Sequence, residues 1–283
     1  MTLHESKNAG YPDLGRLQRV AGDTAPGPQR PTLHAQTDLG SRTAGDDRFE
    51  RLARLAEPEN WADDLSVLRA YVEWTFERLH RQRRVQTSPD GGHHVFDTGL
   101  ATPRQEAIYG LFVPNEDPDG PPWQLDDWLP ACEPRLHDAF PEPPGPATYT
   151  DDPADFVYDW RCELSADPRR LLETRDNRAV LPGPLRSNPY QAGLVLESAV
   201  HRAAARVRRS HRAAVPCWDT EQERVHLLLP LALTTPDGVD VALVVAREGT
   251  AYQGHTILGL AAAYARARQL SRPGEWLGTH AQS

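Results

Sequence analysis

The sequence predicts an α+β fold: a single domain with a central mostly antiparallel or mixed sheet flanked by helices, preceded by a flexible arm. Two nearly continuous apolar runs, 225–234 and 239–247, are joined by a Pro-Asp-Gly turn, which indicates a hairpin covered on both faces. Helical and strand patterns follow one another without the regular alternation of a parallel α/β fold. The domain is expected to span residues 45–278 and the arm residues 1–44.

The arm is rich in Gly, Pro and Thr, a composition that is typical of disorder. Two helices are expected after it, at 46–56 and 63–81. In the second, apolar residues recur at helical spacing, acidic residues occupy the first turn and arginines occupy the end.

Three strands are expected in the middle of the chain, at 94–100, 107–114 and 156–160. The Pro- and Asp-rich stretch 114–154 contains Trp123 and Trp128. It is predicted to be an ordered surface excursion held in place by these two tryptophans.

The C-terminal part is expected to hold a short helix at 167–175, a Pro-containing loop at 181–190 and a long helix at 190–211. After the hairpin, residues 252–258 form either a third strand or the entry to a last helix. That helix runs through Leu270, before a proline.

Composition narrows the classes of function. The net charge is −9, which argues against a surface built for duplex DNA. The three cysteines are widely spaced, so the sequence predicts neither a zinc ribbon nor a disulfide framework. A polar N-terminus and the lack of any long apolar run predict a cytoplasmic protein that does not enter membranes.

The tripeptide Asp97-Thr98-Gly99 follows two apolar residues, as it does in aspartic proteases. There two such aspartates share a proton, and a homodimer could supply the second one. The simpler reading is a strand that ends in a turn. His93, His94 and Asp97 could also bind a metal, but neighbours on a strand point to opposite faces, so no metal site is predicted.

The helix at 190–211 carries the strongest positional signal for binding. Arg202, Arg206 and Arg209 are spaced to form one stripe, and guanidinium groups suit phosphate. The alternative is a solvated helix face. Polar segments beside apolar strands, at Arg104 and at 252–256, are further candidates to line a site.

A series of short motifs resembles domain-of-unknown-function family 3825, an uncharacterised bacterial family, over about residues 50–277. The motifs lie at 96–100, 102–103, 108–109, 214–216, 227–231, 241–245, 252, 254–256, 263–264, 267–268 and 276–277. The resemblance implies a link to RNA, because in that family the domain sometimes sits beside RNA-binding winged-helix modules of the LOTUS type.

The chain departs from the family pattern at three positions. Asp97 stands where Asn is common, and Ala261 and Ala265 stand where Asp and Asn are expected; Tyr264 and Arg268 match. An Asn could not act as a protease carboxylate, so the first departure weakens the protease reading. The other two suggest that a family activity depending on them is altered here.

The expected function is therefore an RNA- or nucleotide-linked protein, a hydrolase or phosphoryl-transfer enzyme if it is catalytic. Asp97 or His255 would be the acid or base. The expected substrate-binding residues are Thr98, Arg104, Arg202, Arg206, Arg209, Tyr252, Thr256, Tyr264 and Arg268. The alternative is a non-catalytic RNA- or nucleotide-binding module, and a minor alternative is the homodimeric aspartic protease.

Overall fold

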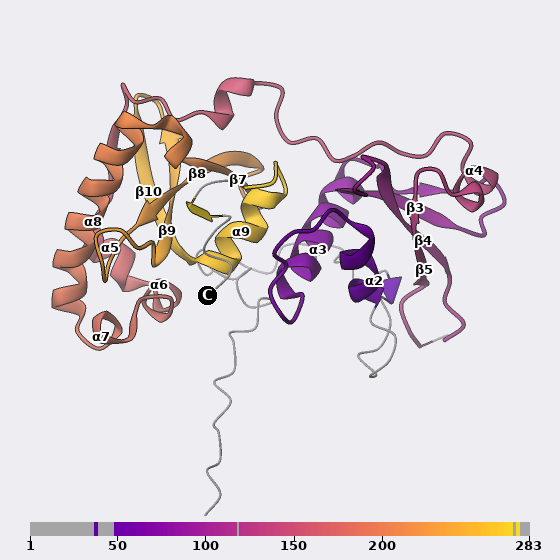
Figure 1. Ribbon diagram of the computed structural model, residues 1–283, viewed down its shortest axis with the longest axis horizontal. Coiled ribbons are helices and arrows are strands. Elements are labelled where there is room, and N and C mark those ends of the chain that lie inside the picture. Colours follow the sequence, from indigo (N-terminus) through magenta and orange to yellow (C-terminus); the bar gives the residue numbers. More distant parts are fainter. Residues whose placement is uncertain (1–36, 39–47, 118, 274–275, 278–283) are drawn as a thin grey trace, which may run out of the picture.

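The computed structural model describes residues 37–38, 48–117, 119–273 and 276–277 (Figure 1). The strands are β1 (Thr37–Asp38), β2 (Gln86–Thr87), β3 (His94–Ala101), β4 (Ala107–Pro114), β5 (Trp123–Pro130), β6 (Glu163–Ser165), β7 (Val215–Asp219), β8 (Arg224–Leu231), β9 (Val241–Glu248) and β10 (Ala251–Gly259). The helices are α2 (Arg48–Leu55), α3 (Ser66–Arg81), α4 (Pro134–Ala139), α5 (Pro168–Glu173), α6 (Arg175–Ala179), α7 (Gly183–Arg186), α8 (Pro189–Arg209) and α9 (Leu260–Arg268).

The α+β class is confirmed, and the strands are divided between two five-stranded sheets where one central sheet was expected. Sheet A has the order β1-β5-β4-β3-β2, and sheet B has the order β6-β10-β9-β8-β7. In each sheet only one edge strand, β1 or β6, pairs in parallel, and the other neighbours are antiparallel. Most of the arm predicted for 1–44 lies outside the described residues, but Thr37 and Asp38 pair with β5.

Sheet B is covered on both faces, as its apolar runs predict. Leu243 and Val245 of β9 face a cluster that includes the buried side of α8, while Ala242 and Val244 face the cluster that contains α9. Adjacent strand residues point to opposite faces, so a strand that is buried on both sides has to be apolar throughout.

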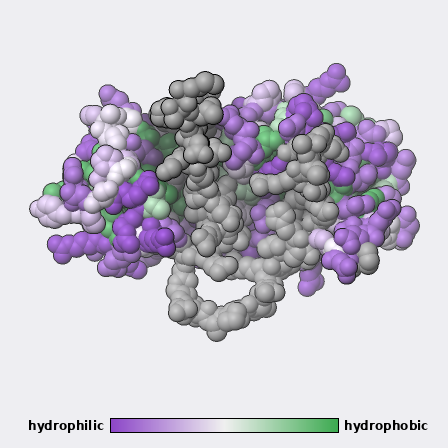
Figure 2. Space-filling model, turned by 90° about the horizontal axis from the view of Figure 1, so that it is seen from below, coloured by the Kyte–Doolittle hydropathy of each residue, from purple (hydrophilic) through white to green (hydrophobic). Residues whose placement is uncertain are grey.

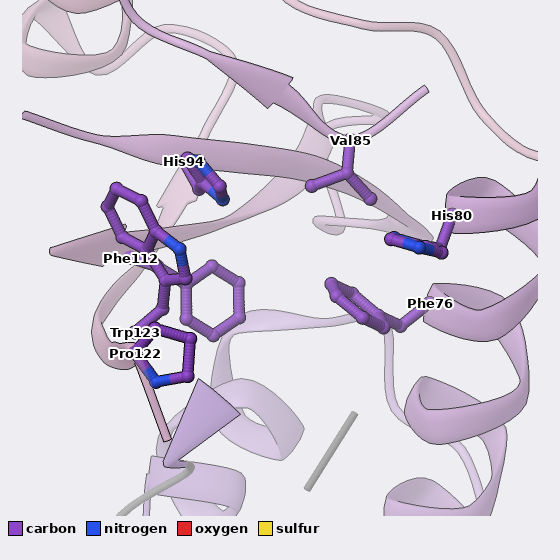
Figure 3. A pocket seen from close by; sticks show the side chains of 7 residues that line it. All are labelled: Phe76, His80, Val85, His94, Phe112, Pro122 and Trp123. Atoms are coloured by element: carbon purple, nitrogen blue, oxygen red, sulfur yellow. The ribbon is translucent and has the colours of Figure 1, made fainter. Parts of the chain in front are cut away.

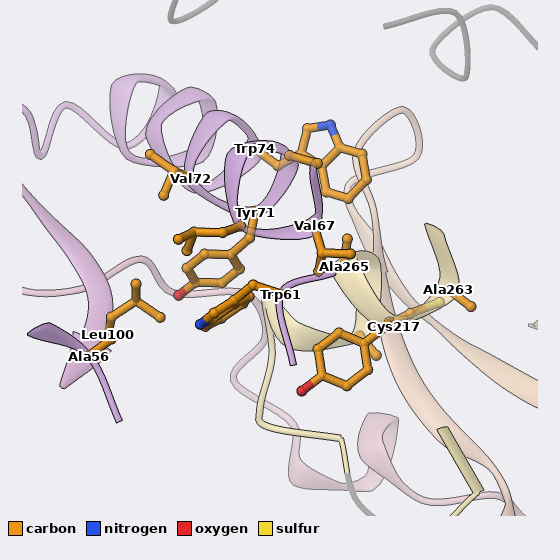
Figure 4. Packing of buried hydrophobic residues seen from close by; sticks show 14 of the residues in the cluster. Ala56, Trp61, Val67, Tyr71, Val72, Trp74, Leu100, Cys217, Ala263 and Ala265 are labelled. Carbon is orange, nitrogen blue, oxygen red and sulfur yellow. The ribbon is translucent and has the colours of Figure 1, made fainter. Parts of the chain in front are cut away.

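One hydrophobic cluster joins the two halves of the molecule. In Figure 1, α3 and α9 face each other between the two sheets, and they are in contact. Figure 4 shows Val67 of α3 beside Ala265 of α9, in the same cluster as Trp61 and Tyr71. Four of the five alanines of α9 are buried, Ala261 being exposed, and the small buried side chains let the helix approach its neighbours closely.

Three parts of the chain differ from the sequence prediction, and in a fourth the structure decides between two alternatives. The stretch 114–154 contains strand β5 and helix α4, and the loop 181–190 contains α7. Residues 156–160 are not a strand: a 3-10 turn, Pro153–Phe156, precedes an irregular segment in which Trp160 is 63% exposed. Among the described residues, no strand pairs with this segment of alternating aromatic residues. Residues 252–258 belong to strand β10, which settles the alternative between strand and helix entry.

No helix among the described residues combines the length and apolar character needed to cross a membrane.

Candidate functional site

Asp97, Thr98 and Gly99 form a bulge in β3, where the register with β4 shifts. The hydroxyl of Thr98 donates to the carbonyl of Ile108 (2.6 Å) and accepts from the amide of Leu100 (3.1 Å). Gly99 has φ +70°, a backbone conformation that residues with a side chain rarely adopt. A Cβ there would also lie 2.6 Å from the hydroxyl of Tyr71, so both the backbone and the available space favour glycine. The local structure therefore accounts for Thr98 and Gly99 without a catalytic role.

The carboxyl group of Asp97 is buried, with the residue only 4% exposed. Burial raises its pKa to about 6, and the Gly99 amide, which donates to Oδ1 at 2.8 Å, opposes that rise. Such a pKa suits an acid or base near neutral pH. A side chain this enclosed does not favour the shared proton of a protease dyad, which needs a second carboxylate beside it.

Three of the predicted substrate-binding residues meet in a network at the junction of the two halves. The hydroxyl of Tyr264 donates to Glu59 (2.7 Å), and the Nε–H of Arg268 donates to both oxygens of the same carboxylate (2.7 and 3.0 Å). The guanidinium of Arg268 also lies over the ring of Tyr71, 5.1 Å from its centre, and the Tyr71 hydroxyl donates to the carbonyl of Thr98 (2.9 Å).

This network leaves little of Arg268 for a ligand. Its side chain is 14% exposed and that of Glu59 is 3% exposed. A buried guanidinium paired with a buried carboxylate is already neutralised. The geometry thus favours a role in joining the halves over the phosphate-binding role predicted for Arg268. Glu59 was missed by sequence reasoning, and no local pattern marks it.

Tyr252 and Thr256 are held by contacts within the C-terminal half. The hydroxyl of Tyr252 accepts from the amide of Asp159 (3.0 Å), and its ring stacks on Tyr158 with centres 4.4 Å apart. The hydroxyl of Thr256 donates to Oδ1 of Asn177 (2.6 Å). Asn177 is 1% exposed and was also missed, because a single Asn in a short helix carries no distinctive signal.

His255 lies beside a second histidine that sequence reasoning did not identify. The rings of His226 and His255 are 5.8 Å apart and nearly parallel, and Nε2 of His255 is 3.4 Å from Glu248. Arg224 donates to Nε2 of His226 (3.0 Å), so that nitrogen is unprotonated. Burial lowers the pKa of His226 to about 4, against the opposing effect of Asp219.

The two expected acid/base residues are therefore separate. Asp97 is on β3 of sheet A and His255 is on β10 of sheet B, and their immediate contacts share no residue. Over the part of the chain that the structure describes, no group of three or more His, Cys, Asp or Glu side chains has an arrangement that could hold a metal ion.

The arginines of α8 form an exposed basic face. The helix is capped by Asn188, whose Oδ1 accepts from the amide of Gln191 (3.1 Å), and its opposite side is buried. This arginine face comprises four arginines of α8 and one in the 3-10 turn His211–Ala213 that follows it. All five are exposed and, within the described residues, no carboxylate pairs with them: Arg202, Arg206, Arg208, Arg209 and Arg212.

Two of these arginines also contact nearby main chain. Arg202 donates to the carbonyl of Ala232 (2.7 Å), and Arg209 donates to that of Ala205 (3.2 Å). Arg104 is exposed in the turn between β3 and β4, on the other sheet, and does not belong to this face. Figure 2 shows hydrophilic side chains over both ends of the molecule in that view.

A family model described as "Domain of unknown function (DUF3825)" matches residues 52–276. No curated protein and no solved structure matches the chain.

Proposed function

Because the chain belongs to the DUF3825 family, whose description names no activity, we propose its function from its own surface: it binds RNA through the arginine face of α8. The observation that carries this proposal is the set of five exposed arginines without a carboxylate partner among the described residues. In a protein with a net charge of −9, such a face is a local exception.

Electrostatics supports a phosphate ligand at this face. Guanidinium groups bind phosphate through paired hydrogen bonds and remain charged at any physiological pH. The acidic remainder of the protein repels a polyanion and so restricts its approach to the basic face. The helix dipole does not explain all five arginines, because its effect is confined to the last turn.

The same helix supports single-stranded RNA over a duplex. Tyr190, in its first turn, is 78% exposed, and an exposed aromatic ring offers a surface on which a base can stack. Tyr190 and Arg208 are eighteen positions apart, about five helical turns, and so lie along one line of the helix. Stacking and phosphate contacts together are typical of proteins that bind single strands.

A binding function explains the positions of Asp97, His255 and the arginine face better than a catalytic function does. Asp97 is buried in sheet A, His255 is in sheet B, and the arginine face is on the outer side of α8. An RNA hydrolase needs its acid, its base and its phosphate-binding groups around one bond.

A salt titration with labelled single-stranded RNA tests the proposal. The double variant Arg206→Ala/Arg209→Ala removes two arginines while keeping Arg202, which also supports the carbonyl of Ala232. Each phosphate contact in a single strand contributes about 0.7 to the slope of log K against log salt, so the slope should fall by about 1.4.

The matched control is Arg54→Ala/Arg83→Ala, which removes two exposed arginines in the other half and should leave the slope unchanged. Equal slopes for wild type and the α8 variant would overturn the proposal. The same samples are examined for RNA cleavage, and altered RNA ends would replace the binding function with a catalytic one.

A further inference from the structure

A cavity of about 340 Å³ lies in the N-terminal half, between α3 and strands β3, β4 and β5 of sheet A (Figure 3). Its floor is formed by Phe76 and Phe112, which are both buried. The remaining lining residues are half-buried or exposed, so the cavity opens to the surface: His80, Val85, His94, Pro122 and Trp123. Its volume is near the lower end of small-molecule sites, which cover roughly 300–1,000 Å³.

The cavity is lined by two stacked pairs of flat rings, and Phe76 of the floor belongs to one of these pairs. His94 stacks on Trp123 with ring centres 3.5 Å apart and planes at 22°. His80 stacks on Phe76 with centres 6.2 Å apart and planes at 23°. Figure 3 shows the first pair on one side of the space and the second on the other. A flat ring that enters between them could make stacking contacts with an aromatic wall.

The residues that line the cavity disfavour a charged ligand. None of the seven residues is an Arg, Lys, Asp or Glu. Burial lowers the pKa of His94, so its imidazole is neutral at physiological pH, and its Nε2 is within hydrogen-bond distance of the hydroxyl of Thr87 (2.9 Å). A phosphate or carboxylate in this cavity would lose its hydration without an Arg or Lys in the lining to pair with it.

The cavity nevertheless offers polar groups. Among the described residues, none forms a hydrogen bond with the ring nitrogens of His80, so these nitrogens can form hydrogen bonds with the edge of a ligand. Of the two ring nitrogens of an imidazole, a protonated one donates a hydrogen bond and an unprotonated one accepts. Aromatic walls with a few polar groups are the usual composition of a site for a neutral heterocycle.

We propose that this cavity binds one uncharged, flat heteroaromatic ring of the nucleobase class, stacked between its aromatic walls with its edge facing His80. The site is distinct from the arginine face, because its lining residues lie in α3 and around sheet A. Nothing in the proposal depends on RNA binding by α8.

The test uses the full chain with the four common nucleosides, which have bases but no phosphate, and with toluene as an apolar probe. Binding is measured by calorimetry and by the rise in the thermal midpoint that a ligand of the folded state produces. At least one nucleoside should bind. The variant Val85→Trp, which fills the cavity from its rim, should weaken that binding at least tenfold.

Two further variants keep the test independent of folding defects. Val157→Phe enlarges an exposed side chain away from the cavity and should leave nucleoside binding unchanged. His80→Phe keeps a flat ring but removes the nitrogens, so it should weaken nucleoside binding about tenfold and leave toluene binding unaffected. Binding of toluene alone, or of no probe, would overturn the proposal.

Nucleoside binding in the cavity can be tested separately from RNA binding at the arginine face of α8. Because nucleosides have no phosphate, Arg206→Ala/Arg209→Ala should bind them as the wild type does. Loss of nucleoside binding in that variant would contradict the assignment to this cavity.

Discussion

At the scale of single residues, Asp97 shows the clearest conflict between a side chain and its surroundings. Its carboxyl group is buried in sheet A, where its one hydrogen bond in the described structure comes from the amide of Gly99. Its pKa is therefore raised from 3.8 to about 6. A group that holds a proton more tightly in the folded state than in the unfolded state makes the fold less stable as pH rises through that interval.

Asp97→Asn should stabilise the protein at pH 7. An Asn keeps an oxygen that can accept from Gly99 and has no charge to desolvate. The gain should be on the order of 2 kcal/mol at pH 7 and should disappear near pH 4, where Asp97 is protonated in the folded state. Urea unfolding at several pH values between 4 and 7 measures it.

Asp151→Asn is the control, because Asp151 is exposed and its replacement removes the same charge. Only the Asp97 variant should flatten the fall in stability between pH 4 and 6. If Asp97→Asn is less stable than wild type at pH 7, then the carboxylate has a stabilising partner and our account of this site is wrong.

At the scale of elements, the packing of β4 depends on a residue without a side chain. Gly110 lies between the rings of Phe96 and Trp128: a Cβ there would be 2.5 Å from one and 2.9 Å from the other. Both rings are fully buried and form part of the cluster that continues into α3. Close packing of this kind leaves no room for an added methyl group.

Gly110→Ala should therefore lower the free energy of unfolding by about 1–3 kcal/mol, the usual cost of overpacking a core. Gly145→Ala is the matched control, since a Cβ at Gly145 meets no atom within 4 Å. Chemical denaturation of both variants makes the comparison. Equal stabilities would show that Phe96 and Trp128 can move aside at little cost.

At the scale of the whole molecule, two sheets depend on one shared core. Residues from α3, sheet A, α9 and sheet B belong to a single buried cluster. Beside it, the ion pair between Glu59 and Arg268 ties the segment before α3 to α9. The single domain predicted from the sequence remains a prediction, and this shared core is the reason to expect the two halves to unfold together.

Arg268→Ala should destabilise the protein by about 3 kcal/mol, because it leaves the buried carboxylate of Glu59 without its cation. The control is Arg272→Ala: Arg272 contacts the neighbouring Pro58 carbonyl (2.8 Å) but has a side chain that is 55% exposed. Its loss should cost less than about 1 kcal/mol. Thermal and urea unfolding compare the two.

Hydrogen exchange of the same variants tests whether the halves are coupled. In Arg268→Ala, the amides of both sheets should exchange faster by the same factor. Faster exchange in one sheet alone would mean that the halves unfold separately. If Arg268→Ala and Arg272→Ala are equally stable, then the ion pair between Glu59 and Arg268 does not hold the two halves together.

The periodic spacing of apolar residues was enough to identify those helices and strands whose buried faces follow that spacing. Helices α3 and α8 and the pair β8 and β9 could be predicted because their apolar spacing depends only on near neighbours along the chain. The exposed arginines of α8 follow from the same spacing. The segment 156–160 shows the limit of this reasoning, because in the described part of the chain no strand pairs with its strand-like pattern.

Tertiary structure alone decided which residues meet. Strand β5 is hidden in a Pro- and Asp-rich stretch and exists because β4 pairs with it. Glu59 and Arg268 are 209 positions apart, and Asn177 and Thr256 are 79 apart. Local spacing cannot predict such pairs, since their contact depends on how complete elements pack. For the same reason Arg268, a predicted phosphate ligand, is neutralised by a carboxylate, while Arg206 remains exposed.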